Sequence, residues 1–424
     1  MIYAPYKWVL MTLLTVAVVN VYGQVSIDEY RREVIDFSHT AESSKVATEA
    51  AEADMRVARK GYLPSLDMSR DAGYAFRDRG EVRQLDWVMR ADITQPIFYG
   101  GQVRASAKRA EMLHSGAQSY EQSTLLGVLY DAEVAYWQLS KAETYLEAIG
   151  DYHDIVGSLR QVVARRFAEG YTSKSDLLQV ESRLSDAEYQ LSMARQQWLQ
   201  ALHRFNVLRG YEPTLQVVLK ESILDTMDMP IRSDVEELIA RHPDYMAAVA
   251  EREASRWGVK VVRASYLPRV GMGVYGLWQP ATPNVKGAGT RVDGGVTISM
   301  STPIYHFGER REAMRSARSD LRRSELTVED VVDRITLGES DAWTNLVSTR
   351  ERVDAVRRNL ILATENLDIS TYSYHEGLAT ILDVLQAQLS WLQIYQNAIA
   401  ALSDYALAIS AYRYISTYQL EITN

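Results

Sequence analysis

The chain of 424 residues contains no cysteine. A disulfide, a thiolate metal site, a cysteine nucleophile and a lipid-modified N-terminal cysteine are therefore excluded. Beyond residue 23 there is also no apolar run of about 18 residues, the length that a membrane-spanning helix needs. If the chain crosses a membrane, it must therefore do so with strands that close into a barrel.

Proline is scarce and unevenly placed. All ten prolines lie outside two long spans, 97–212 and 304–424. Because proline interrupts helices, both spans can be helical over most of their length. At about 1.5 Å per residue, the predicted helix at 102–169 alone forms a rod of roughly 100 Å, which is too long for a compact domain.

An excess of positive charge is also missing, because acidic residues outnumber basic ones and the formal net charge is −9. No dense tract of lysine and arginine with interleaved aromatic residues is present. Both features argue against nucleic acid as a partner.

Signatures of catalysis are missing as well. The seven histidines include no pair at a spacing of four, so the zinc protease motif is absent. The run 271–276 fits the glycine spacing of a dinucleotide site, but a helix precedes it and Pro280 follows where a helix should begin. Neither a nucleophile elbow nor a pair of carboxylates stands out. We expect no enzyme activity, no catalytic residue, no cofactor and no metal.

The N-terminus has the pattern of a secretory signal peptide. Lys7 precedes an apolar run at 8–19, and Val21, Tyr22 and Gly23 follow it. This pattern predicts a signal peptide at 1–23, cleaved after Gly23, and hence an exported protein. Loss of Lys7 with the signal changes the formal net charge from −9 to −10.

The mature sequence contains two copies of one long repeat. An aromatic residue, Glu-Gly, an Asp six residues later and a Gln recur at an offset of 207 residues, so Gly170 matches Gly377 and Asp176 matches Asp383. Pro96 matches Pro303 at the same offset, and Tyr-Leu-Pro at 62–64 recurs at 266–268. We predict two structural repeats at 24–210 and 232–424, joined by a linker or equatorial element at 211–231.

Each repeat contains a segment in which apolar and polar residues alternate with a period of two. This alternation predicts β-hairpins at about 65–97 and 268–303. Strands with one apolar face suit an outer-membrane barrel, although they also suit a soluble sandwich. The apolar positions are Leu66, Met68, Ala72, Tyr74, Phe76, Trp87, Met89, Ala91 and Ile93 in the first repeat, and Val270, Met272, Val274, Val292, Val296, Ile298 and Met300 in the second.

Long helices follow each hairpin. We predict them at about 102–169 and 174–209 in the first repeat, and at about 308–373 and 379–417 in the second. Residues at spacings of seven favour coiled-coil packing between them. Examples are Leu177, Leu184, Leu191, Trp198 and Phe205, and in the second repeat Ile381, Gln388, Tyr395, Leu402 and Ile409.

Each pair of long helices is joined by a Glu-Gly turn. Gly170 and Gly377 occupy positions where a helix can end in a left-handed residue, and the Ser and Thr residues that follow can cap the next helix. Asp176 and Asp383 lie in the first turns of those helices, so each has a purely structural interpretation as a cap or dipole partner.

This order of elements resembles the TolC-type outer-membrane efflux channel family over nearly the whole mature chain. The resemblance implies a mainly α fold with a small β part, in which a helix, a β-hairpin, a long helix and another helix are repeated. It further implies a homotrimer that forms a 12-stranded outer-membrane β-barrel, continued by a periplasmic α-helical barrel. An inner-membrane transporter and a periplasmic adaptor are its implied partners, together with outer-membrane lipid.

The resemblance also assigns residues. Asp176, Tyr374 and Asp383 match the periplasmic gate, whereas Ala379 stands where well-studied members have a gate arginine and Gln386 where they have a second ring aspartate. The turns that contact the adaptor correspond to Gly170, Tyr171, Thr172, Gly377, Leu378 and Ala379. Aromatic residues expected at the membrane interface are Tyr74, Trp87, Tyr275 and Trp278.

We therefore expect the exit channel of a tripartite efflux pump or of a type I secretion system, in the outer membrane with a large periplasmic portion. The alternative is a periplasmic coiled-coil adaptor or scaffold that forms no channel. The duplicated alternating hairpins favour the channel, and the sequence leaves open whether drugs, metal ions or proteins are the cargo.

Overall fold

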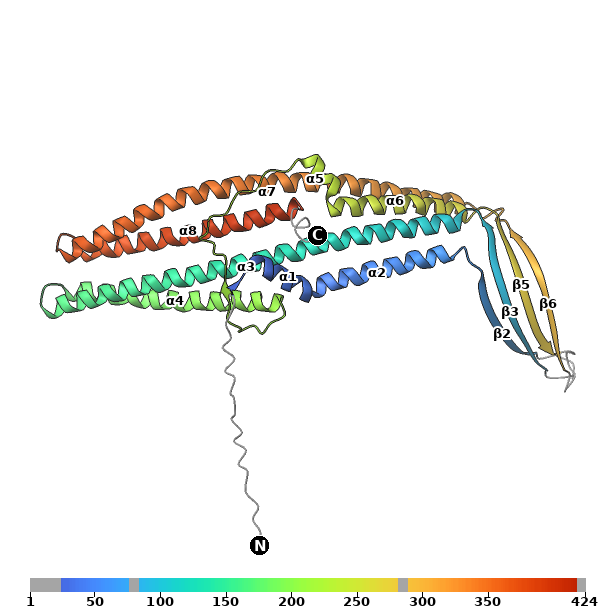
Figure 1. The fold of residues 1–424 in the computed structure, drawn as a ribbon, viewed down its shortest axis with the longest axis horizontal. Helices are drawn as coiled ribbons and strands as arrows, with labels where there is room; N and C mark the ends of the chain where they lie inside the picture. The colour runs from blue at the N-terminus through green and yellow to red at the C-terminus, as the bar shows by residue number, and fades with distance from the viewer. Residues whose placement is uncertain (1–23, 76–83, 281–288, 418–424) are drawn as a thin grey trace, which may run out of the picture.

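The computed structural model describes residues 24–75, 84–280 and 289–417. The predicted signal peptide at 1–23, Phe76 and the loop 78–83 lie outside the described residues. Figure 1 shows a long rod of helices with a β-sheet at one end and two helical hairpin tips at the other. The sheet is turned away from the axis of the rod.

The elements follow the repeated order along the chain. The first half contains β1 (Gln24–Val25), α1 (Ile27–Phe37), α2 (His39–Lys60), β2 (Ser65–Ala75), β3 (Gln84–Tyr99), α3 (Gln102–Ala168) and α4 (Lys174–Leu208). The second contains β4 (Val218–Leu219), α5 (Val235–Arg241), α6 (Pro243–Ala264), β5 (Arg269–Pro280), β6 (Thr290–Ser301), α7 (Glu309–His375) and α8 (Ile381–Ile415).

The duplication is visible in the lengths of the helices. Both α3 and α7 have 67 residues, and both α4 and α8 have 35. The proline-free segment before the first hairpin forms two helices, α1 and α2, rather than one. The helix divides at Ser38, whose extended backbone ends α1 and whose side chain accepts a hydrogen bond from the amide of Ala41 at the start of α2.

The four long strands form one antiparallel sheet in the order β2-β3-β5-β6. The pairing of β3 with β5 joins the two repeats, and a register shift between Pro96 and Phe98 interrupts it. A bulge is expected there because proline has no amide hydrogen to donate. β1 and β4 pair separately, in parallel.

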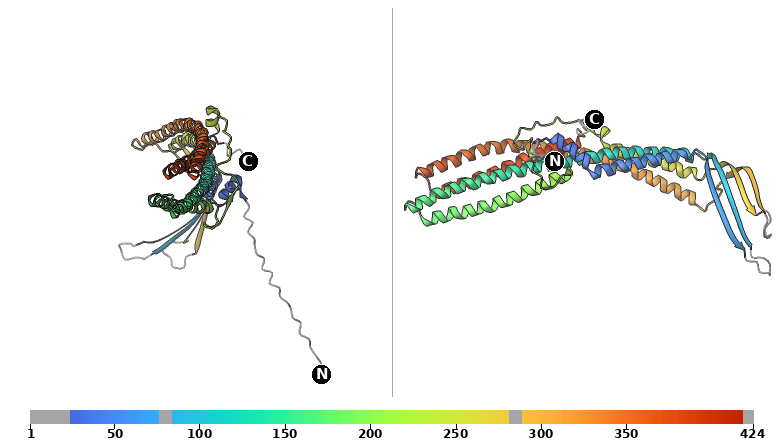
Figure 2. Two further views of the ribbon diagram at one scale, coloured as in Figure 1. Left: turned by 90° about the vertical axis from the view of Figure 1, so that its left-hand side faces the viewer. Right: turned by 60° about the horizontal axis from the view of Figure 1, so that its bottom comes forward.

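The helices continue the order of the strands as a single layer. Near the sheet, α3 packs against α2 on one side and α6 on the other, and α6 packs against α7. Towards the tips, α3 packs against α4 and α8, and α8 packs against α7. The end-on view in Figure 2 shows the helices arranged along an arc.

The main hydrophobic core lies near the middle of the rod, where α1 and the segment after α4 cover the long helices. The rings of Tyr30 and Phe205 stack with centroids 3.9 Å apart. The Tyr136 hydroxyl donates to the Glu221 carboxylate at 2.6 Å, and Ile223 is buried in the same cluster. The segment 211–231 thus wraps the middle of the rod.

Candidate functional site

The two helical tips have the same backbone conformation. Gly170 and Gly377 have positive φ angles of 81° and 73°, which glycine adopts without strain. The Tyr171 amide donates to the Arg166 carbonyl at 2.8 Å, and the Leu378 amide donates to the Ser373 carbonyl at 2.8 Å. With the shorter-range bonds of the two glycine amides, each tip is a Schellman motif that satisfies the last carbonyls of the long helix.

Asp176 and Asp383 both take part in capping boxes. Asp176 Oδ2 accepts from the hydroxyl of Thr172 at 2.7 Å and from the amide of Ser173 at 3.2 Å. Asp383 Oδ2 accepts from the hydroxyl of Thr380 at 2.7 Å and from its amide at 2.8 Å. These bonds stabilise the ionised carboxylates, so the pKa of each aspartate lies below its ordinary value, mainly because of the Thr172 and Thr380 hydroxyls.

Tyr374 lies on the inner side of the second tip and is almost fully buried. The Arg166 guanidinium, from the last turn of α3, lies 4.7 Å from the centroid of its ring. The same guanidinium donates to the Tyr374 carbonyl at 3.1 Å and to the His375 carbonyl at 2.8 Å. One arginine of the first repeat therefore holds the C-terminal end of α7 in the second repeat.

Within one chain, the predicted gate residues have different contact partners. The hydrogen bonds of Asp176 and Asp383 stay within their own turns, whereas Tyr374 contacts Arg166. Sequence analysis missed Arg166, although a basic residue in the last turn before Gly170 is a known stabiliser of a helix end.

The remaining tip residues divide into exposed and packed ones. Tyr171 and Leu378 are apolar side chains with about four fifths of their surface exposed, at 80% and 81%. Ala379 is partly buried against a cluster shared by α3, α4, α7 and α8, whose buried members are Leu159, Val163, Val180, Tyr374, Ile381, Val384 and Leu385. In each tip, the residue directly after the glycine, Tyr171 or Leu378, therefore presents an exposed side chain.

The sheet at the other end has one apolar face. The register places Leu66 opposite Ile93, Ile93 opposite Val274, and Val274 opposite Val296. Partner residues in antiparallel strands project from the same face. Other exposed apolar residues of this face are Met68, Met272, Val292, Ile298 and Met300. A contiguous exposed apolar surface of this kind marks contact with a lipid or a protein.

The opposite face is polar. Arg90 pairs with Asp92 at 2.7 Å, and Arg291 pairs with Asp293 at 2.9 Å. Tyr275 lies on this face, with Arg90 at 5.0 Å from the centroid of its ring.

The four predicted interface aromatics are therefore divided between faces. Trp87 lies two residues before Met89 on β3, and Trp278 of β5 pairs with Met89, so both tryptophans project from the apolar face. Tyr275 lies on the opposite face, because it is out of phase with Met272 and Val274. Tyr74 belongs to β2, and its side chain lies outside the described residues.

None of the helices in the described ranges is long and apolar enough to cross a bilayer. In the same ranges, no group of three or more His, Asp and Glu side chains is placed to hold a metal ion.

A sheet with one apolar face is thus joined to a layer of helices, of which α3 and α7, with 67 residues each, are about 100 Å long. The chain belongs to the outer membrane efflux protein family, because the family profile matches residues 38–210 and 235–411, more than half of its length. The two matched segments correspond to the two copies of the repeat.

Individual relatives agree with this assignment. The outer membrane efflux protein BepC of Brucella suis is 24% identical over 86% of this chain and 79% of its own length. The outer membrane protein TolC of Escherichia coli is 20% identical over 85% of this chain and 75% of its own length. The crystal structure of CusC has the same fold, with a TM-score of 0.81, 14% identity and coverage of 94% and 95% of the two chains.

Membership of this family places the protein in the outer membrane, with its helical portion in the periplasm. It also favours an efflux or secretion channel over a periplasmic scaffold that forms no channel, and the family consists of channel proteins rather than enzymes.

Proposed function

We propose that three copies of this chain close into one exit channel, with a 12-stranded closed sheet in the outer membrane and a helical tunnel in the periplasm. The observation that carries the proposal is the pair of open sheet edges. In the described part of the chain, β2 and β6 each have a partner strand on one side only. An open edge leaves backbone groups unpaired, which costs several kcal/mol per group in lipid.

Closure by more than one chain follows from the number of strands. A barrel needs about eight strands before side chains can fill its interior, so the four long strands of one chain are too few. The helical layer supports the same closure, because α7 lies at one edge and α2 and α4 lie at the other. Near the tips, α7 exposes Leu362 and Ile369 at a spacing of seven, and α4 exposes Leu178 and Tyr189. These side chains would be covered where α7 of one copy meets α4 of the next.

In this assembly the channel serves a tripartite efflux pump or a type I secretion system. The periplasmic adaptor would contact the tip turns, where Tyr171 and Leu378 are exposed beside Gly170 and Gly377. An inner-membrane transporter would deliver the cargo to the tips. The polar face of the sheet would line the exit, and the apolar face would contact lipid.

We place the gate at the same tips, with Tyr374, Asp176 and Asp383 as its residues. Ala379 cannot supply a guanidinium there, because its side chain is a methyl group. Arg166 supplies one from the other repeat and binds the end of α7 to α3. Opening would require the two hairpins of a chain to separate at this contact.

The test combines oligomeric state with conductance. The full chain purified in mild detergent should migrate as a trimer in native electrophoresis and should form small conductances in a planar bilayer. Asp383→Ala should alter the conductance and its cation selectivity, because it removes an acidic side chain and loosens a capping box at the entrance. A monomer in mild detergent that forms no conductance would overturn the proposal.

A further inference from the structure

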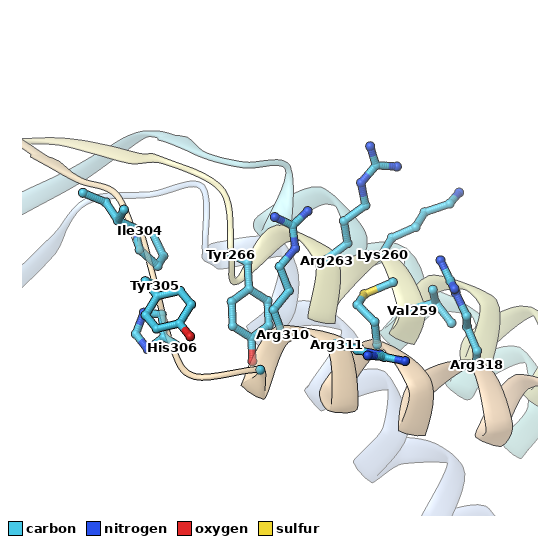
Figure 3. A pocket seen from close by; sticks show the side chains of 13 residues that line it. Val259, Lys260, Arg263, Tyr266, Ile304, Tyr305, His306, Arg310, Arg311 and Arg318 are labelled. Atoms are coloured by element: carbon cyan, nitrogen blue, oxygen red, sulfur yellow. The ribbon is translucent and has the colours of Figure 1, made fainter.

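A cavity of about 730 Å³ lies at the corner where the sheet meets the helices. It is bounded by the C-terminal end of α6, the N-terminal end of α7 and the segment between β6 and α7. Figure 3 shows Lys260 and Arg263 of α6 beside Arg310, Arg311 and Arg318 of α7. All five cationic side chains are exposed. We call this group the basic corner.

The basic corner lacks neutralising carboxylates. Arg263, Arg310, Arg311 and Arg318 form no ion pair with any residue in the described ranges. Two carboxylates are adjacent in sequence. Glu309 accepts from the Tyr266 hydroxyl at 2.9 Å and lies 3.6 Å from His306 Nδ1, and Glu312 pairs with Arg315 at 3.9 Å. Cations gathered around a cavity repel one another unless an anion joins them.

The first repeat provides an internal comparison. At the offset of 207 residues, Arg318 corresponds to Glu111. Glu111 pairs with Lys108 at 3.0 Å and with Arg59 at 3.6 Å. The equivalent place in the first repeat, between α2 and α3, which we call the first corner, therefore carries its own counter-charge. The second corner has an arginine in place of that carboxylate, and its charge is therefore not neutralised in the same way within the chain.

An exposed apolar segment lies beside the basic corner. Ile304, Tyr305 and Phe307 expose 93%, 72% and 91% of their surfaces. Phe307 has a φ angle of 42°, a left-handed conformation that is unfavourable for a residue with a bulky side chain. The segment follows β6 directly, so it lies where the apolar face of the sheet ends and the helices begin.

We propose that the basic corner binds the phosphate headgroup of an anionic phospholipid from the periplasmic leaflet of the outer membrane, while Ile304, Tyr305 and Phe307 contact the lipid beside it. The inference rests on the proposed function, because it requires the sheet to lie in the bilayer. Basic side chains next to apolar and aromatic ones at a membrane surface match the chemistry of such a lipid. One lipid would bind per chain.

The experiment is native mass spectrometry of the purified full chain from micelles that contain phosphatidylglycerol and phosphatidylcholine with identical acyl chains. The wild-type protein should retain phosphatidylglycerol preferentially. Arg318→Glu, which copies the first corner, should reduce that preference about tenfold or more, because it reverses one charge beside the phosphate. Phe307→Gly, which fits the left-handed backbone, should weaken retention of the same lipid.

Two variants in the first corner serve as matched controls. Arg104→Glu, at the position equivalent to Arg311, should leave the preference unchanged, and Glu111→Arg should increase the number of phosphatidylglycerol molecules retained. The same spectra report the number of chains. A trimer without lipid preference would overturn this inference alone, whereas a monomer would overturn the proposed function.

A free anion is the remaining outcome. If excess inorganic phosphate displaces phosphatidylglycerol completely and Phe307→Gly has no effect, the corner is a simple anion site and the lipid proposal is wrong. Retention in the presence of phosphate, with sensitivity to both Arg318→Glu and Phe307→Gly, supports the lipid.

Discussion

At the scale of single residues, Arg166 is the side chain that joins the two repeats at the periplasmic tip. It makes two hydrogen bonds to carbonyls at the end of α7 and lies over the ring of Tyr374. The pair is partly screened by solvent, so we expect a contribution of about 1 kcal/mol rather than that of a buried ion pair.

Arg166→Gln should loosen the end of α7. We expect amide hydrogen exchange at Gly377 and Leu378 to accelerate about fivefold, which corresponds to the loss of about 1 kcal/mol. Mean conductance should also rise if this contact holds the gate closed. Arg165→Gln is the matched control, because Arg165 is exposed on the same turn. Equal exchange rates in the two variants would show that Arg166 does not secure the tip.

The two capping aspartates predict a dependence on pH. Their folded-state pKa values are lowered, so the unfolded chain binds more protons in acid. The stabilisation is complete above the ordinary pKa of aspartate, about 3.9, and is lost as pH falls through the lowered values. The protection of the Asp176 and Asp383 amides against hydrogen exchange, relative to unstructured amides at the same pH, should therefore fall below about pH 4. In Asp176→Ala and Asp383→Ala, the substituted tip should lose this pH dependence, and an unchanged pH profile would contradict the assignment.

At the scale of elements, the tips depend on glycine in the left-handed region. Gly377→Ala forces a Cβ into that region, which should cost about 1–2 kcal/mol at the turn. Gly150→Ala within α3 is the control. No atom lies within 4 Å of a Cβ added there, so it should stabilise the helix by about 0.5–1 kcal/mol. Thermal unfolding followed by circular dichroism should therefore move in opposite directions for the two variants, and a shift in the same direction would refute this account.

The sheet should tolerate charge on one face only. Ile298→Arg places a cation on the apolar face, which should cost about 2–4 kcal/mol if that position lies near the bilayer midplane. Thr297→Arg places the same cation one residue away, on the polar face. The yield of membrane-inserted trimer should fall for Ile298→Arg and stay near the wild-type value for Thr297→Arg. Equal yields would argue against a lipid-facing apolar surface.

At the scale of the whole molecule, one chain leaves the edges of its sheet and of its helical layer uncovered. Its sheet has two open edges, and its helical layer ends in α7 on one side and in α2 and α4 on the other. The middle of the rod is covered by α1 and by the segment 211–231, whereas the long helices near the tips pack mainly on one another. In the proposed trimer, the stability of the tips would therefore depend most on neighbouring copies.

The parts of this architecture that were predictable are those that the sequence encodes locally. Helix ends are marked by Gly170, Gly377 and the capping residues after them, and the long helices end within two residues of the expected positions. Strand faces follow from alternation over a few residues. The same alternation places Tyr275 on the face opposite to Val274, so the four aromatic residues expected at the membrane interface do not all share one face.

The sequence by itself determined the duplication, the helical and extended segments, and the residues that cap the tips, because each depends on neighbours within a few positions. The tertiary structure decided the strand order β2-β3-β5-β6, the contact of Arg166 with Tyr374 and the gathering of cations around Arg318. These features join residues that are from about 50 to more than 200 positions apart in the chain. No periodic pattern along a sequence encodes such contacts, since they arise only when elements distant in the chain pack side by side.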